Sequence, residues 1–180
     1  MKRRRPGVSS ADRGDCLDAF QREIVGLLPR MRRLARAIAR DAADADDLVQ
    51  VAVERALNRR DQWRPGTRLD SWVFTIMKHA WIDETRARKR RGALFAPEEQ
   101  GENVADARGS QAEARLEAAS VEQAMARLPQ DQRLAVALVL VDGLSYREAA
   151  EVLEVPMGTL TSRLVRGRQA LIAQLEGEAA

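Results

Sequence analysis

The sequence predicts an all-α fold made of two small helical domains, and two observations support this prediction. Alanine, leucine, arginine and glutamate dominate the 180 residues, whereas the chain has only 11 glycines and 6 prolines. This composition favours helices over a turn-rich sheet. Apolar residues also recur at steps of three and four along most of the chain, which is the period of a helix with one buried face.

The apolar period stops in the middle of the chain. Residues 92–111 contain Pro97, Gly101 and Gly109 among acidic residues, which is typical of a flexible linker. We therefore expect a disordered basic tail over residues 1–18, a first domain over 19–91, an acidic linker over 92–111 and a second domain over 112–176. The linker acids are Glu98, Glu99, Glu102 and Asp106. They suggest a mimic of nucleic acid inside a basic channel, with a plain soluble tether as the alternative.

Charge is distributed unevenly along the chain. Residues 1–91 hold 22 lysines and arginines against 13 aspartates and glutamates, a net charge of +9, although the whole chain carries only +3. A basic front half indicates a polyanionic partner such as nucleic acid, and arginines that merely solubilise helices are the alternative.

Two helices are expected at the start of the first domain. An apolar stripe marks the first, at Phe20, Ile24, Leu27, Met31, Leu34 and Ile38. Pro29 should kink or divide this helix, because proline lacks the amide hydrogen that a helix interior uses. The second helix is expected to open at Asp44 as its capping residue and to bury Val49, Ala52, Val53 and Ala56. Its other face carries Asp47, Gln50 and Glu54.

A turn and a third helix complete the first domain. Pro65-Gly66 is a turn signal, and Thr67 resembles the N-terminal cap of the helix that follows. The expected buried residues are Leu69, Trp72 or Val73, Ile76 and Ala80. The helix ends in residues that can neutralise phosphates, Arg86, Arg88, Lys89, Arg90 and Arg91.

Four aromatic residues, Trp63, Trp72, Phe74 and Trp81, precede this basic run. An aromatic face beside cations suits the stacking of a single-stranded base. Trp72 is on the apolar stripe and is expected in the core. Trp63 and the loop from Arg64 to Arg68 are therefore the better candidates for contact with an unstacked base.

The second domain is predicted to contain four helices. The first should bury Val121, Ala124, Met125 and Leu128 and end before Pro129. The second covers Gln130 to Val141, where an apolar run also fits a strand, but the spacing of Leu134, Leu138 and Val141 favours a helix. Gly143 is placed to end that helix.

The last two helices form a predicted helix-turn-helix motif. Ser145 and Glu148 form a capping box, and Glu154-Val155-Pro156 makes the turn. The second helix, from about Met157 to Gln174, turns Leu160 and Leu164 inwards. Its outward face presents groups that bond base edges and phosphates, Thr159, Ser162, Arg163 and Arg166. A solvated basic helical hairpin is the simpler alternative.

Three sequence blocks resemble the extracytoplasmic-function sigma factors, a family of bacterial transcription initiation factors. The string from Leu144 to Ala150, followed by Val155 to Leu164 and Arg166-Gly167-Arg168, resembles region four of this family. Asp44 to Gln50 resembles its polymerase-binding helix. Asp70 to Ile76, with Ile82-Asp83 and the basic run, resembles its promoter-opening helix. The resemblance covers nearly everything from Phe20 to Leu175.

The resemblance implies partners and sites for both domains. The partners would be core RNA polymerase (its β′ clamp and β flap), promoter DNA and an anti-sigma factor. Core polymerase would contact Asp47, Gln50 and Glu54. The −10 element would contact Trp63, Arg64, Arg68, His79, Arg86, Lys89 and Arg90. The −35 element would contact Thr159, Ser162, Arg163 and Arg166. Helical spacing predicts that Arg163 reads a base and Arg166 binds phosphate, with the exchanged roles as the alternative.

Two positions depart from the family pattern. Glu154 occupies the turn position where glycine is common, and His79 stands where asparagine is common. The first departure requires a glutamate to adopt a conformation that favours glycine.

Other chemistry is not indicated by the sequence. Cys16 is the only cysteine and His79 the only histidine, so a zinc site of the usual kind within one chain is excluded. We expect no catalytic residues, no metal and no cofactor, and no segment reaches the roughly 20 apolar residues that span a bilayer. A cytoplasmic location is therefore expected. The rival functions are a helix-turn-helix activator or repressor and a nucleic-acid-cutting or recombining enzyme.

Overall fold

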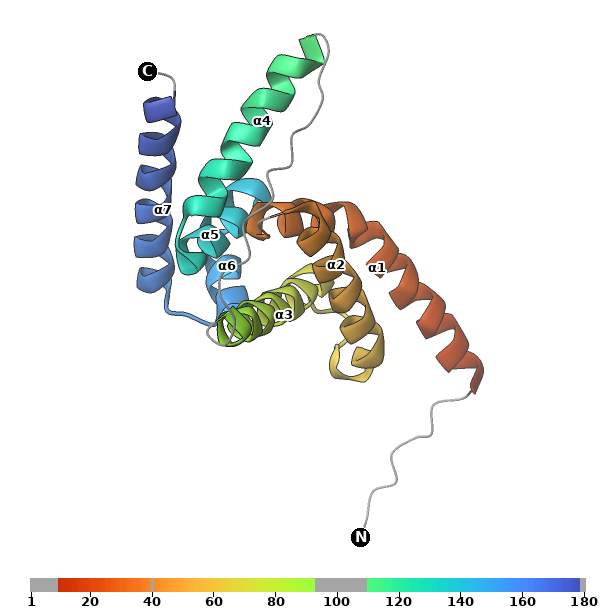
Figure 1. The fold of residues 1–180 in the computed structure, drawn as a ribbon. Helices are drawn as coiled ribbons and strands as arrows, with labels where there is room; N and C mark the ends of the chain where they lie inside the picture. The colour runs from red at the N-terminus through yellow and green to blue at the C-terminus, as the bar shows by residue number, and fades with distance from the viewer. Residues whose placement is uncertain (1–9, 40, 93–109, 179–180) are drawn as a thin grey trace.

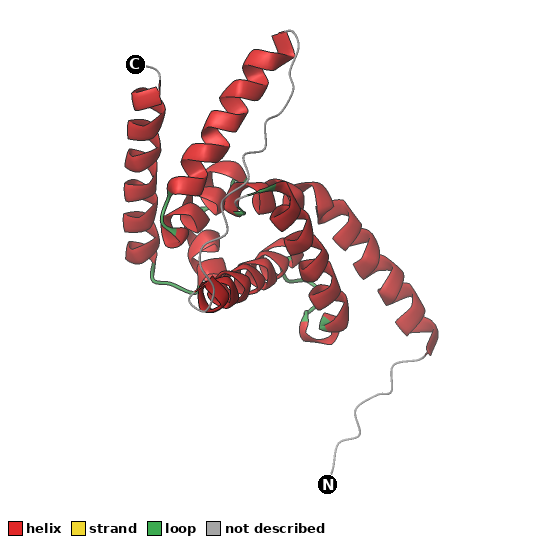
Figure 2. Cartoon of the chain, in the orientation of Figure 1, coloured by secondary structure: helices red, strands yellow, loops and turns green. Residues whose placement is uncertain are grey.

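The computed structural model describes residues 10–39, 41–92 and 110–178. Within these ranges the elements are helices joined by short turns, with no β-strand (Figure 2). The predicted all-α class is confirmed. The first nine residues and most of the predicted acidic linker, residues 93–109, lie outside the described residues.

The first domain contains three α-helices and a short 3-10 turn (Figure 1). These elements are α1 (Ser10–Ile38), α2 (Ala42–Asn58), η1 (Arg60–Gln62) and α3 (Leu69–Gly92). α1 begins at Ser10, so the expectation of a disordered tail up to residue 18 is wrong for its second half. No proline interrupts the chain between Ser10 and Leu28, so nothing in the backbone prevents the helix from starting early. Pro29 lies inside α1, and the ribbon bends along this helix.

Two predicted helix caps in the first domain are wrong. The cap of α2 is Asp41, whose carboxylate accepts a hydrogen bond from the amide of Asp44 at 2.8 Å. Asp44 is instead buried and forms an ion pair with Arg88. Thr67 is not the residue that flanks α3, because this helix begins at Leu69, and the Thr67 hydroxyl donates to the carbonyl of Arg64 at 2.7 Å.

The core of the first domain follows the predicted stripes with small shifts. Buried apolar residues of α1 and α2 include Phe20, Ile24, Met31, Leu34, Ile38, Leu48, Val49, Ala52 and Ala56. On α3, Val73 is fully buried whereas Trp72 is only partly buried, so Val73 is the core residue of the two. Val53 and Leu27 are also only partly buried.

The second domain contains the four predicted helices, with one irregular end. They are α4 (Ser110–Arg127), α5 (Gln130–Val136) continuing into the π-helical turn η2 (Ala137–Val141), α6 (Tyr146–Leu153) and α7 (Met157–Glu178). The strand alternative for this apolar run is therefore wrong. Gly143 ends the segment with a φ of 81°, as its position predicts. Val121, which the stripe places in the core, is exposed on α4.

A close approach of α7 to α5 organises the second domain. A Cβ added to the buried Gly167 would lie 2.7 Å from Cγ2 of Val136, which is closer than real Cβ atoms come. Glycine at this position therefore allows α7 to cross α5. Fully buried Leu160 and Leu164 pack into the same core.

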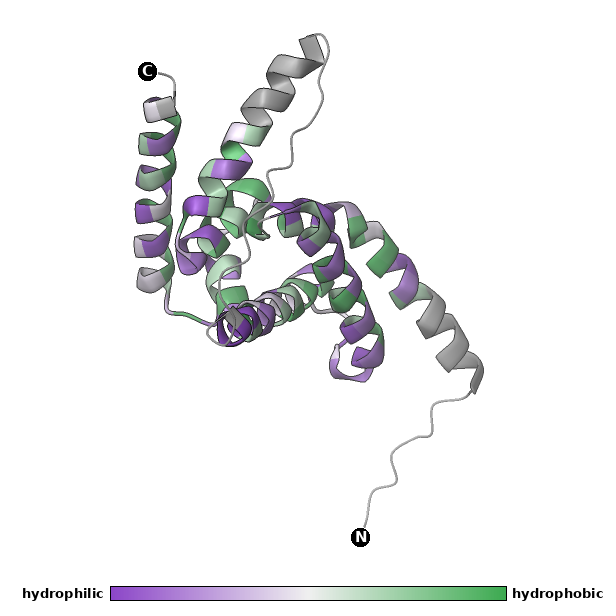
Figure 3. Ribbon diagram, viewed as in Figure 1, coloured by the Kyte–Doolittle hydropathy of each residue, from purple (hydrophilic) through white to green (hydrophobic). Residues whose placement is uncertain are grey.

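The two domains pack against each other in this arrangement. α1 contacts α4, α5 and η2, and α3 contacts α6 (Figure 1). Buried side chains of both domains belong to one continuous apolar cluster. Figure 3 shows hydrophilic residues concentrated along the near end of α3. This end carries the basic run.

Candidate nucleic-acid interface

The predicted polymerase face of α2 lies open to solvent. Asp47, Gln50 and Glu54 are all exposed, and Nε2 of Gln50 donates to Oε1 of Glu54 at 3.2 Å. The opposite side of α2 buries Val49 and Ala52 in the core. The helix therefore separates an apolar side that anchors it from an acidic side that is free to meet a partner.

The basic end of α3 divides into two groups. Arg88 forms ion pairs with buried Asp44 and with Glu84, and these hydrogen bonds raise its pKa above the ordinary arginine value. Arg91 also pairs with Glu84, at 3.0 Å. These two arginines therefore form ion pairs within the domain, and their role on phosphates stays a prediction.

The other three basic residues of this end are Arg86, Lys89 and Arg90. They are exposed and form no ion pair with another described residue. They remain the candidates for phosphate contacts in this region, because their charges face solvent, where bound counterions could be released.

The aromatic candidates are more buried than a stacking platform requires. The ring of Trp63 is partly buried and lies 5.5 Å from that of Phe20, at an interplanar angle of 47°. Phe74 and Trp81 are core residues. The neighbouring Arg64 is exposed, so it is the more accessible member of the predicted loop site.

Two predicted −10 residues contact the second domain. Arg68 forms an ion pair with Glu148 on α6 and also bonds Asp70 through two nitrogens, at 3.0 and 2.6 Å. His79 lies with Nε2 at 3.2 Å from Oε2 of Glu154. The structure thus brings a loop cation and a helix side chain of the first domain onto the helix-turn-helix of the second.

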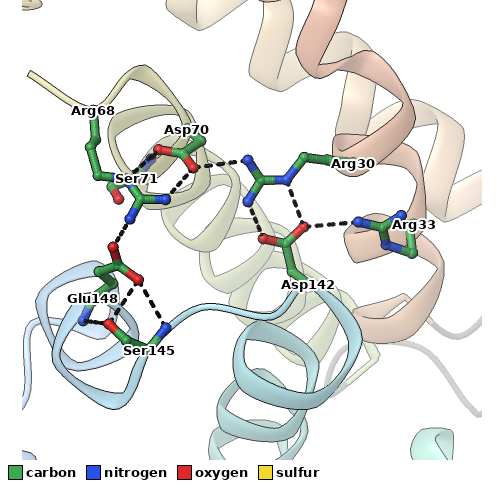
Figure 4. Close-up of polar contacts among 8 residues, drawn as sticks. All are labelled: Arg30, Arg33, Arg68, Asp70, Ser71, Asp142, Ser145 and Glu148. Carbon is green, nitrogen blue, oxygen red and sulfur yellow. Dashed lines mark hydrogen bonds and ion pairs between the residues drawn. The ribbon is translucent and has the colours of Figure 1, made fainter.

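Asp142 forms the centre of a further ionic contact between the domains (Figure 4). Its carboxylate accepts hydrogen bonds from Arg30 at 3.2 and 2.6 Å and lies 3.5 Å from Arg33. Arg30 also donates to Asp70 at 2.9 Å, and its guanidinium lies 5.2 Å from the ring centre of Phe74. One arginine of α1 therefore connects the start of α3 with the second domain.

Asp70 is stabilised as a carboxylate by this network. Burial alone would raise its pKa, but hydrogen bonds from Arg68 and Arg30 outweigh this effect. They hold the pKa of Asp70 well below its usual range. The charge is therefore permanent near neutral pH.

The helix-turn-helix has the predicted local geometry. The hydroxyl of Ser145 accepts from the amide of Glu148, and the carboxylate of Glu148 accepts from the amide of Ser145 at 2.8 Å, which completes the capping box. Glu154 adopts the left-handed conformation, with φ 57° and ψ 43°. Its carboxylate accepts a hydrogen bond from buried Lys78 at 2.7 Å, which lowers the pKa of Glu154.

The predicted −35 residues lie along one side of α7, but they differ in their contacts. Arg163 is partly buried and pairs with Asp131 at the start of α5, with a distance of 2.6 Å. Ser162 donates to the carbonyl of Thr159 within the helix. Arg166 is exposed. The side chain of Arg166 is thus the most accessible cation of this set.

Sequence reasoning missed residues that join the domains, chiefly Arg30, Lys78 and Asp142. Arg30 and Asp142 are 112 positions apart, and no motif or spacing marks them as partners. Lys78 lies in the middle of an otherwise apolar helix segment, and this unusual placement was the one available signal.

Two family models match the chain in the order of its two domains. The model for sigma-70 region 2 covers residues 24–91, and the model for sigma-70 region 4 covers residues 118–171. The first match runs from the middle of α1 to the basic end of α3. The second runs from the middle of α4 through most of α7.

Curated relatives agree with these matches. The chain is 35% identical to the ECF RNA polymerase sigma factor EcfG of Rhodopseudomonas palustris, over 88% of its own length and 86% of the relative's. It is 37% identical to the ECF RNA polymerase sigma factor SigM of Mycobacterium tuberculosis, over 82% and 72% of the two lengths. The chain belongs to the ECF sigma factor family.

Two solved structures share the architecture. The sigma factor RpoE of Bartonella quintana, solved in complex with the anti-sigma factor NepR, matches with a TM-score of 0.71 and 26% identity, over 88% of this chain and 97% of that one. CnrH, solved with the cytosolic domain of CnrY, matches with a TM-score of 0.63 and 24% identity, over 91% and 94% of the chains. In the described part of this ECF sigma factor, no helix is long and apolar enough to cross a membrane.

Proposed function

We propose that this chain is an alternative sigma factor that binds core RNA polymerase, recognises promoters through two DNA elements and supports their melting. Sigma factors are non-enzymatic transcription initiation factors, and membership of the family argues against the rival regulator and enzyme functions. The observation that carries the proposal is the pair of region matches, which fall in the correct order on two separate helical domains.

The chemistry of each surface suggests which partner it would bind. The acidic face of α2, formed by Asp47, Gln50 and Glu54, would bind core polymerase. The loop after η1 and the exposed cations of α3 would bind the −10 element. The exposed side of α7 would enter the major groove of the −35 element, since a helix of this kind presents residues three and four apart to one groove.

An anti-sigma factor is the proposed inhibitory partner. The support is that RpoE, which shares the fold over nearly its whole length, was solved in complex with the anti-sigma factor NepR. Most of the acidic linker lies outside the described residues. A mimic of nucleic acid in a basic polymerase channel stays a prediction for it, with a soluble tether as the alternative.

Run-off transcription with purified core polymerase on a library of promoters tests the proposal directly. We expect specific transcripts from a subset of promoters only when the chain is present. A chain that gives no transcript from any promoter, while a known sigma factor supports transcription with the same core enzyme, would contradict the proposed function.

A further inference from the structure

We propose that a cavity at the basic end of α3 binds a small polyphosphate anion, either free or carried by a nucleotide. The cavity lies where this end of α3 meets the turn that joins α4 to α5. Such a site adds a small-molecule ligand to a chain whose proposed partners are all macromolecules. It does not depend on which surface binds which promoter element.

The size and the lining of the cavity suit a small ligand. Its volume is about 560 Å³, within the range of roughly 300–1,000 Å³ that is typical of small-molecule sites. The first domain supplies Trp81, Thr85, Arg88 and Lys89, and the second domain supplies residues 126–130 and Arg133. A ligand in the cavity would therefore contact both domains.

The charges around the cavity favour an anion. Four of the described residues that line it are cations and none of them is acidic, so the potential inside the cavity is positive. The cations are Arg88, Lys89, Arg127 and Arg133. Asp44 and Glu84 bind Arg88 but do not line the cavity. They reduce the net charge at Arg88 without placing a carboxylate where the ligand would lie.

Two of the four cations are held in fixed positions. The guanidinium of Arg133 is buried and donates to the carbonyl oxygen of Leu128 at 2.9 Å. The guanidinium of Arg88 donates to Asp44 and Glu84 through three of its N–H groups, and an arginine has five. Side chains that are already ordered lose little conformational freedom when a ligand binds, which favours affinity.

Lys89 supplies an exposed charge to the cavity. Its ammonium group is a compact charge with three donors, which suits a phosphate group. The neighbouring cations Arg86 and Arg90 are also exposed, but they do not line the cavity. The cavity therefore shares only Lys89 with the proposed −10 surface.

The other lining residues suit the organic part of a nucleotide. Trp81, Leu128 and Pro129 supply apolar atoms. Nε2 of Gln130 donates to Oγ1 of Thr85 at 3.1 Å, so two groups that form hydrogen bonds lie in the same lining. A base can be bound by such a combination of apolar contact and hydrogen bonds. An inorganic polyphosphate would use the cations alone.

The test uses the full chain and two probes, ATP and inorganic triphosphate, without divalent cations and at physiological ionic strength. Gln130→Glu places a carboxylate in the cavity with little change of side-chain size. Its matched control, Gln123→Glu, adds the same charge at an exposed site of α4. Lys89→Gln removes a lining cation, and its control, Arg86→Gln, removes an exposed cation of α3 outside the cavity.

Calorimetric titration measures the Kd and the stoichiometry, and thermal unfolding shows that each variant is folded. We expect one site per chain and a Tm of the wild-type chain that rises with probe concentration. Gln130→Glu should weaken binding about tenfold or more and Lys89→Gln about three- to tenfold, whereas each control should change the Kd by less than about twofold.

Tighter binding of ATP than of triphosphate would support the site and identify a nucleotide as its ligand. Equal binding of the two probes would support the site with the polyphosphate group alone as the ligand. Failure of both probes to bind the wild-type chain would overturn the proposal. Equal weakening by the cavity variants and their controls would overturn it as well, because it would show diffuse attraction to a basic chain.

Discussion

The two proposed binding faces of the first domain differ in what covers them. The α2 face is acidic and exposed, whereas the α3 face is basic and in part paired with the second domain. Residues 112–180 contain 7 basic and 10 acidic residues, a net charge of −3. Such a domain is attracted to the cations of α3 and repelled by the acids of α2. The net negative charge of the second domain therefore favours its contact with the α3 face over the α2 face.

Substitutions on the exposed face of α2 have the largest expected effect on binding. Replacing Asp47, Gln50 and Glu54 with alanine should weaken binding to core polymerase about 100-fold, because these side chains face the proposed partner. Helicity should be unchanged, since all three are exposed. Titration with labelled core enzyme measures the affinity. The control is Asp61→Ala with Gln62→Ala on η1, and equal binding by both variants would remove α2 from the interface.

A third predicted face lies on α7 of the second domain, where Arg166 is exposed. Arg163→Ala should cost about 1–3 kcal/mol on −35 DNA and relax the preference at one position. Arg166→Ala should weaken all sequences alike and lower the salt slope by about one unit. Binding to duplex variants across a salt series separates these outcomes.

Asp131 supplies the control for that experiment, because it pairs with Arg163 at 2.6 Å. If Arg163 contacts DNA, Asp131→Asn should tighten DNA binding severalfold, because it frees the guanidinium of Arg163. Wild-type affinity and preference in both arginine variants would show that this helix does not read the −35 element.

Substitution of Asp70 tests the ionic network that this residue forms with Arg30 and Arg68. Asp70→Asn should lower the free energy of unfolding by about 1–2 kcal/mol near neutral pH, because the carboxylate accepts charged hydrogen bonds from Arg30 and Arg68. Its folded pKa is lowered, so its contribution is fully present above the unfolded value of about 4 and is lost as the pH falls through the folded pKa.

The difference between wild type and Asp70→Asn should therefore stay constant from pH 8 to about pH 5 and shrink below about pH 4. Urea unfolding at a series of pH values measures it. The more exposed Asp83→Asn provides the control, with an expected change of less than about 0.5 kcal/mol. A difference that grows on acidification would contradict the assigned sign.

The smallest expected effect concerns the turn residue Glu154. Both Glu154→Gly and Glu154→Gln remove its ion pair with Lys78, but only glycine relieves the left-handed conformation. Glu154→Gly should therefore be more stable than Glu154→Gln by about 0.5–1 kcal/mol in thermal unfolding. Equal stability of the two variants would mean that the turn is unstrained.

Local signals predicted most of the fold. The capping box at Ser145 and the end of a helix at Gly143 each depend on residues close in sequence. The cap of α2 was harder to predict, because several aspartates compete for it. The choice of Asp41 reflects a distant residue, since Arg88 engages Asp44 in the folded domain.

The candidate site was predictable only in part. Exposure of the α2 acids follows from the helical period, and so does the row of polar residues on α7. The pairing of Arg68 with Glu148 and of Arg163 with Asp131 depends on how helices pack in space. Spacing along one helix carries no information about such partners, so side chains expected to face DNA were found in contact with the protein itself.

The π-helical turn at Ala137–Val141 makes the position of Asp142 depend on the number of residues in this segment. The amide of Asp142 donates to the carbonyl of Ala137, five residues earlier, at 3.0 Å. Such a turn contains one more residue than an α-helical path would use. Each helical residue turns the chain by roughly 100°, so deletion of one residue here would rotate Asp142 away from Arg30 without altering any charge. The relative orientation of the domains is thus encoded partly by the number of residues in this segment, and a single insertion or deletion would change it more than many substitutions.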